Sequence, residues 1–119
     1  MTERYSTDNE HTAKNPMVIG VDIRNEIRDD NNYGQKANWG NGDENDWHLV
    51  ATTAGNLILK TNPDQLIIIE GLNYALDMDF IRSMPIQLEI PNKLVYSFHL
   101  YSFSCFDYNG YDDFKNKMT

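Results

Sequence analysis

The chain has 119 residues, of which 18 are acidic and 10 basic, so its formal net charge is −8. This length supports one small domain. The acidic balance argues against a nucleic-acid partner and against a basic membrane-surface helix, so we expect neither kind of partner. The single cysteine, Cys105, excludes an intrachain disulfide and any multi-cysteine metal site.

The first sixteen residues are polar and contain no apolar run, so they show no secretory signal. We interpret 1–16 as a frayed helix end or loop and 17–119 as the domain itself. The localisation stays unknown from this chain.

Three short apolar runs predict strands. The run at 16–23 is β-branched and continuous, which is typical of a strand buried on both faces. The runs at 66–69 and 94–101 predict two further strands. The segment 85–91 alternates apolar and polar residues like a short exposed strand, and 111–118 resembles the start of a helix.

One helix is strongly marked between the first two strands. Asp46 has the character of an N-cap, Trp47 opens the helix, and apolar residues then recur at helical spacing. The sequence Thr61-Asn62-Pro63 ends it, because proline cannot continue a helix. The preceding segment 28–46 is rich in Asp, Asn and Gly and predicts a long loop, a length that is usually functional.

Strands that alternate with a helix predict a parallel α/β sheet. Polar residues follow all three strands: Asn25 and Glu26, then Glu70, then His99 and Tyr101. Because sites in parallel α/β folds form at the carboxyl ends of the strands, this edge is the predicted functional site.

The chain resembles glycoside hydrolase family 5, the cellulase family, and in particular its endo-β-1,4-glucanases. The resemblance runs from about residue 15 to about residue 101. It rests on an ordered set of motifs: VIGVDIRNE, WGNGD, Asp46-Trp47, Ala54-Gly55-Asn56, Asn62-Pro63, LIIIEG and PNKLVYSFHLY.

The resemblance implies a partial (β/α)8 TIM barrel, about strands four to six of eight, and a retaining two-carboxylate hydrolysis of β-glucans. It implies that Glu26 is the general acid/base and that Asn25 hydrogen-bonds a sugar hydroxyl. His99 and Tyr101 match the family's His-x-Tyr motif, which contacts the sugar and orients the nucleophile. Ile27 follows the Asn-Glu pair where the common family form has proline.

In the family the nucleophile is a glutamate that ends strand seven, which this chain does not reach. We therefore expect the 119-residue chain alone to be inactive. Glu70 ends strand five and is no substitute; we interpret it as a structural, salt-bridged carboxylate. The resemblance also implies an extracellular parent enzyme.

Aromatic rings present flat faces to sugars, so Trp39 is a candidate substrate-binding platform, and Tyr33 is another; Trp47 is expected to pack in the core. No cofactor is expected, because Gly40-Asn41-Gly42 lacks the third glycine of a dinucleotide fingerprint. No metal is expected, because the three histidines are dispersed. The alternative hypotheses are a non-catalytic carbohydrate-binding protein and a truncated pseudoenzyme fragment.

Overall fold

The structure is a computed structural model that describes residues 15–101. The expected loop or helix end at 1–14, Cys105 and the predicted helix at 111–118 lie outside the described residues.

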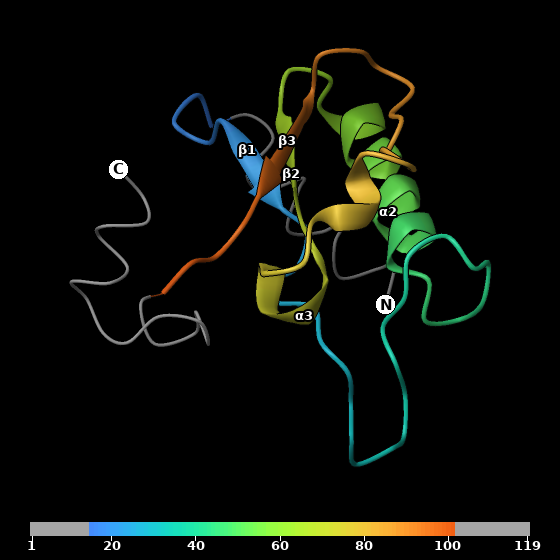
Figure 1. Ribbon diagram of the computed structural model, residues 1–119. Coiled ribbons are helices and arrows are strands. Elements are labelled where there is room, and N and C mark those ends of the chain that lie inside the picture. The colour runs from blue at the N-terminus through green and yellow to red at the C-terminus, as the bar shows by residue number, and fades with distance from the viewer. Residues whose placement is uncertain (1–14, 102–119) are drawn as a thin grey trace.

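Three parallel strands form one sheet in the order β1-β2-β3 (Figure 1). They are β1 (Gly20–Asp22), β2 (Leu66–Glu70) and β3 (Leu94–Ser97). Gly20 pairs with Leu66, and Ile67 pairs with Leu94. The predicted parallel α/β arrangement is confirmed.

The prediction that 16–23 is a strand buried on both faces is wrong. The strand is three residues long, and Ile19 is 75 % exposed. Within residues 15–101, β1 is an edge strand, so only side chains facing the helix, such as Ile23, are buried. The third strand ends at Ser97 rather than at residue 101, so His99 lies in the segment that follows it.

Helix α2 (Trp47–Thr61) begins and ends where the sequence predicts. Asp46 caps it by accepting the Leu49 N–H at 3.1 Å, and the same carboxylate accepts the N–H groups of Gly40 and Gly42, both at 2.8 Å. Because Asp46 is buried, this one side chain both starts the helix and closes the loop before it.

Replacing Asp46 by Ala is expected to lower the free energy of unfolding by about 2 kcal/mol, because a cap is lost and loop amides lose their acceptor. Burial by itself would raise the pKa of Asp46, but the three N–H donors lower it below its ordinary value of 3.8. The stability from this carboxylate is therefore present above pH 3.8 and lost as the pH falls through the folded pKa. Urea denaturation of wild type and Asp46→Ala should show a stability difference that shrinks at low pH.

The core lies between α2 and one face of the sheet (Figure 1). Gly55 faces Ile67 so closely that an added Cβ would lie 3.1 Å from the Ile67 Cγ2 and 2.9 Å from the Leu88 Cδ2. A glycine at this helix position therefore lets the helix approach the sheet. The buried apolar side chains that form this core cluster are Ile23, Ile27, Trp47, Ala51, Ile58, Leu59, Ile67, Ile69 and Ile86.

The prediction of a strand at 85–91 is wrong, although its alternation is real. Ile86 is buried while Gln87 and Glu89 are exposed. The backbone hydrogen bonds go to side chains instead of a neighbouring strand: Ile86 N–H donates to the Tyr96 hydroxyl at 2.7 Å, and Glu89 N–H to the Asn56 Oδ1 at 2.9 Å. The segment is an extended cover over α2.

Between β2 and this cover the chain makes the short turn labelled α3 (Leu72–Ala75) and the 3-10 helix η1 (Asp79–Ile81). Within α3, Asn73, Tyr74 and Ala75 all have positive φ angles of 52°, 61° and 62°. Each such residue costs about 1–2 kcal/mol in backbone strain. Gly71 permits the turn, because a Cβ there would collide with the Asp77 carbonyl oxygen.

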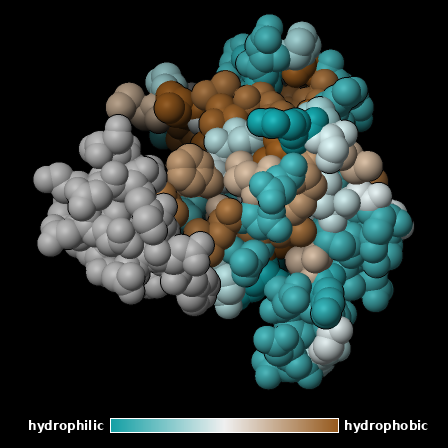
Figure 2. All heavy atoms as spheres, viewed as in Figure 1, coloured by the Kyte–Doolittle hydropathy of each residue, from teal (hydrophilic) through white to brown (hydrophobic). Residues whose placement is uncertain are grey.

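Apolar residues gather in the upper part of the molecular surface, whereas the lower lobe, which is the 28–46 loop, is hydrophilic (Figure 2). Met17, Ile19 and Phe98, which flank the strands, are among the exposed apolar side chains. Within residues 15–101 no helix has both the length and the apolar content needed to cross a bilayer.

Candidate active site

The carboxyl ends of the three strands bring acidic side chains and one histidine together. Asp22 pairs with Ile68, so it shares a sheet face with Glu70, two residues further along β2. Ser97 pairs with Glu70, which places His99 just beyond the end of β2. We call Asp22, Glu26, Glu70 and His99 the acid–histidine cluster.

Glu26 contacts two other members of this cluster, Glu70 and His99. Its side chain is 27 % exposed, and its Oε1 is 3.0 Å from the Nδ1 of His99. Its backbone N–H donates to the Glu70 Oε2 at 2.6 Å. The φ angle of Glu26 is 53°, a left-handed conformation that is rare for a residue with a side chain. The structure thus holds a strained, partly exposed carboxylate at the carboxyl edge of the sheet.

Glu70 is completely buried, in contrast to Glu26. Its Oε1 is 3.1 Å from the Nε2 of His99, close enough for an ion pair although the two atoms are not aligned as a hydrogen bond. The Glu70 carbonyl oxygen accepts the indole N–H of Trp47 at 2.9 Å. The expected pairing of Glu70 at its strand end is therefore present, and its partner is a histidine.

The pKa of His99 is raised above 6.5, chiefly by its hydrogen bond to Glu26; burial opposes this, and the charges of Glu70, Glu26 and Asp22 add smaller upward effects. The pKa of Asp22 is raised by partial burial, and next by the neighbouring Glu70. His99 and Asp22 therefore titrate under the influence of the carboxylates next to them.

Replacing Glu26 by Gln is expected to lower the pKa of His99 towards 6.5, because it removes the largest cause of the shift. The stability from the charged imidazole is present in full below pH 6.5 and lost as the pH rises through the raised pKa. A titration of the imidazole protons by NMR checks this, with Glu89→Gln on the exposed surface as the control. An unchanged titration in Glu26→Gln would contradict the assignment.

The other two predicted strand-end residues lie beside the cluster. Asn25 precedes Glu26 and is exposed. Tyr101 is exposed and presents a ring edge to His99, with centroids 6.5 Å apart. Both are placed where a bound molecule would reach them, and their predicted contacts with sugar stay predictions.

Trp39 lies away from the contacts of the cluster. Its ring stacks on Phe80 with centroids 4.6 Å apart, meets the edge of His48, and donates its indole N–H to the Met84 carbonyl at 2.9 Å. One face of the Trp39 ring thus packs on Phe80, so a sugar could stack only on the opposite face of this ring. Trp47 is buried in the core, as predicted, whereas Tyr33 is largely exposed in the 28–46 loop.

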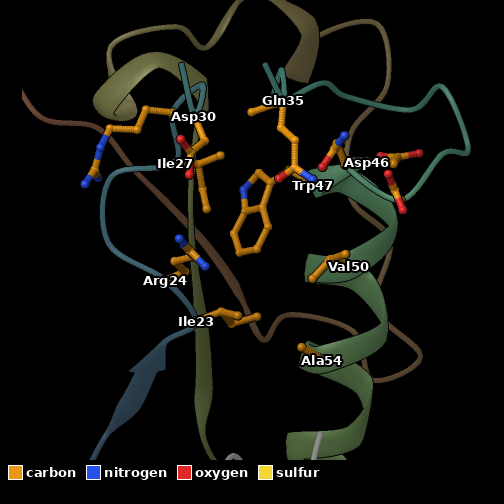
Figure 3. A pocket seen from close by; sticks show the side chains of 13 residues that line it. Ile23, Arg24, Ile27, Asp30, Gln35, Asp46, Trp47, Val50 and Ala54 are labelled. Carbon is orange, nitrogen blue, oxygen red and sulfur yellow. The ribbon is translucent and has the colours of Figure 1, made fainter. Parts of the chain in front are cut away.

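A pocket of about 420 Å³ lies between α2 and the segment after β1 (Figure 3). Trp47 projects into it from the first turn of α2, opposite Ile23 and Ile27. Glu26 and His99 are not among its lining residues, so this hollow is separate from the cluster. Across residues 15–101, no group of three or more His, Cys, Asp or Glu side chains has an arrangement that would bind a metal ion.

Sequence reasoning placed Glu26 and His99 in the site but missed the contribution of Asp22, and it gave Glu70 a structural role only. A signal for Asp22 was present: a carboxylate in the middle of the otherwise apolar run VIGVDI. Such a residue is expensive to bury unless polar groups surround it. Glu70 is buried and contacts the Glu26 amide only because the carboxyl ends of β1 and β2 lie side by side in the fold.

A parallel α/β sheet with paired carboxylates and a histidine at its carboxyl edge is typical of the active-site end of a (β/α)8 barrel. Residues 5–119 match the family model described as cellulase (glycosyl hydrolase family 5), so the chain belongs to this family. Its fold is part of the (β/α)8 barrel that the resemblance implied.

The chain is 38% identical over 99 residues to an endoglucanase of Paenibacillus polymyxa, an alignment that covers 73% of this chain and 23% of that protein. It is 32% identical over 88 residues to a glycosyl hydrolase 5 family protein of Chamaecyparis obtusa, covering 74% of this chain and 14% of the relative. The chain therefore spans about a quarter or less of these relatives' length.

Solved structures of endocellulases are similar in fold. The hyperthermophilic endocellulase of the archaeon Pyrococcus horikoshii gives a TM-score of 0.74 at 29% identity, covering 83% of this chain and 32% of that one. A complex of the Pyrococcus horikoshii endocellulase with cellotetraose gives 0.70 at 29% identity over the same shares. The catalytic domain of the major endoglucanase of Xanthomonas campestris pv. campestris gives 0.66 at 25% identity, covering 85% and 32%.

Proposed function

We propose that this chain is part of a retaining hydrolase of β-linked glucans, with Glu26 as its general acid/base. The observation that carries the proposal is a 27 % exposed carboxylate, held by His99 at 3.0 Å, at the carboxyl edge of a parallel sheet. This edge is where barrel enzymes bind their substrates. Membership of a cellulase family supports the same reading.

In the first step Glu26 donates its proton to the glycosidic oxygen while the bond between that oxygen and the anomeric carbon breaks. A second carboxylate attacks the anomeric carbon and forms a glycosyl ester. In the second step Glu26 takes a proton from water, whose oxygen attacks the same carbon and releases the second carboxylate. The configuration at the anomeric carbon is therefore retained.

The attacking carboxylate is not Glu70. Glu70 has no exposed surface, and one of its oxygens already accepts the Glu26 N–H at 2.6 Å. A nucleophile must reach the anomeric carbon in the open site, opposite the acid. We therefore assign the second carboxylate to a part of the barrel outside the described residues, and we expect residues 1–119 alone not to turn over substrate.

Asn25 and Tyr101, both exposed beside Glu26 and His99, are proposed to bind sugar hydroxyls, and the face of Trp39 that does not stack on Phe80 is proposed to stack on a sugar ring. The proposed ligand is a β-glucan chain. The complex of the similar Pyrococcus horikoshii endocellulase with cellotetraose supports this choice of ligand class.

The test is the stereochemistry of hydrolysis by the native protein that contains this chain. With a soluble β-glucan as substrate, NMR of the first products is expected to show the β-anomer before mutarotation. A first-formed α-anomer would contradict the retaining mechanism. Saturable binding of cellohexaose without hydrolysis would instead favour the carbohydrate-binding alternative. Turnover by the 119-residue chain alone, if abolished by Glu26→Gln, would overturn the expectation that it is inactive.

A further inference from the structure

Glu70 is the most deeply buried acidic side chain of residues 15–101, and the proposed hydrolysis gives it no chemical step. A buried carboxylate is costly unless donors compensate its charge. Both of its oxygens lie next to groups of the acid–histidine cluster. We propose that Glu70 is a positioning residue, which fixes Glu26 through the Glu26 backbone amide and through the imidazole of His99.

The amide contact fixes the backbone of Glu26. The Glu70 Oε2 accepts the Glu26 N–H at 2.6 Å, and on the other side the Glu26 carbonyl accepts a guanidinium N–H of Arg28 at 3.0 Å. Glu26 itself has the left-handed φ of 53°, from which it would relax if released. Relaxation would swing the carboxylate away from its present direction, and small misplacements of a reacting group are costly for rate.

The imidazole contact fixes the side chain of Glu26. His99 Nδ1 is 3.0 Å from the Glu26 Oε1, and its Nε2 is 3.1 Å from the Glu70 Oε1. An imidazole with a carboxylate oxygen beside each ring nitrogen is held in one orientation, here by the hydrogen bond to Glu26 and by the ion pair with Glu70. The raised pKa of His99, caused first by the hydrogen bond to Glu26, favours the charged form that makes both contacts.

The main chain supports the same geometry from the turn that follows Glu70. Tyr74 N–H donates to the Ile27 carbonyl at 2.9 Å, and His99 N–H donates to the Ala75 carbonyl at 3.2 Å. The strained residues of α3 thereby tie the segments that carry Glu26 and His99 to the end of β2. Strained backbone conformations of this kind persist where contacts with the surrounding structure hold them in place.

Two other titratable groups face His99 or Glu70. Asp22, on β1, interacts with the charges of both, and Tyr101 presents its ring edge to His99. A purely structural carboxylate at the strand end would affect folding alone. A positioning residue also changes the titration of His99 and the pH dependence of the reaction.

This inference rests on the proposed role of Glu26, and Glu70→Gln tests it in the native protein that contains this chain. Glutamine keeps the shape of the side chain but is neutral and has only one acceptor oxygen. It therefore cannot replace both the contact with the Glu26 amide and the contact with His99. We expect kcat on a soluble β-glucan to fall up to about 100-fold, because the reacting carboxylate is misplaced, while KM changes less than about threefold. The pKa of His99, measured by NMR, is expected to fall, and the pH profile to shift with it. The matched control, Glu89→Gln on the exposed cover segment, should match wild type.

A second measurement needs no substitution. In the wild-type protein the Glu26 amide proton is expected to resonate far downfield and to exchange slowly, because it donates to a buried carboxylate. A Glu26 amide that exchanges like a free one would overturn the proposal even if Glu70→Gln failed to fold.

The outcomes separate the two proposals. If Glu26→Gln leaves activity unchanged, the proposed function fails, while the His99 titration and the Glu26 amide still decide the role of Glu70. If Glu26→Gln inactivates the protein but Glu70→Gln matches Glu89→Gln in kcat, titration and amide exchange, the positioning role is wrong.

Discussion

Replacing Glu26 by Gln in the native protein that contains this chain is expected to lower kcat on a soluble β-glucan about 10²–10⁴-fold. Glutamine has the same shape but holds no transferable proton, so the leaving oxygen departs as an alkoxide. The change also replaces the charged acceptor of His99, at 3.0 Å, by a neutral amide, while the backbone contact with Glu70 stays.

The nature of the leaving group distinguishes acid catalysis from a general loss of structure. A substrate with a strongly acidic phenol as leaving group needs no proton, so Glu26→Gln should form the glycosyl ester on it at a rate close to wild type. Its hydrolysis should stay slow, because the same residue serves as base in the second step. An equal loss in the rate of glycosyl-ester formation on both kinds of substrate would contradict the assignment. Glu89→Gln should leave the rates of both steps unchanged.

The second large effect concerns the packing of α2. Replacing Leu59 by Ala is expected to lower the free energy of unfolding by about 2–5 kcal/mol, because Leu59 is 2 % exposed and its loss leaves a cavity. Leu57, two residues earlier in the same helix, is 47 % exposed. Leu57→Ala should therefore cost less than about 1 kcal/mol.

The two variants share the helix, the residue type and the substitution, so helix propensity cancels between them. Urea denaturation followed by circular dichroism measures both. Because single domains are stable by only about 5–15 kcal/mol, Leu59→Ala should shift the midpoint visibly. Equal destabilisation by Leu57→Ala would mean that the outer face of α2 is packed as tightly as its inner face.

Local signals were sufficient for the helix and the central strand. Asp46 at the start and Pro63 after the end fix the bounds of α2, because capping and the missing proline N–H act within a few residues. The run 66–69 is continuously apolar, which is typical of a central parallel strand, and β2 contains this whole run. The polar strand ends likewise predicted the edge of the sheet at which Glu26, Glu70 and His99 come together.

Pairing and burial were decided by segments far apart in the chain. The alternation at 85–91 gives the correct buried side chains but the wrong element, because its amides donate to the side chains of Tyr96 and Asn56 instead of to the backbone of a neighbouring strand. The run at 16–23 resembles a strand buried on both faces, but residues 15–101 cover only one of its faces. Apolar content shows what prefers burial, and the partner elements determine what is buried.

The same division applies to the site. The sequence by itself determined the family, the parallel sheet and the candidates Glu26 and His99, because motifs and periodicity are local. Only the tertiary structure decided that Glu70, 44 residues from Glu26 along the chain, accepts its amide proton from a fully buried position. Whether a carboxylate positions another residue or reacts itself depends on the hydrogen-bond donors and the solvent around it. Those surroundings form only when strand ends that are far apart in the sequence come together.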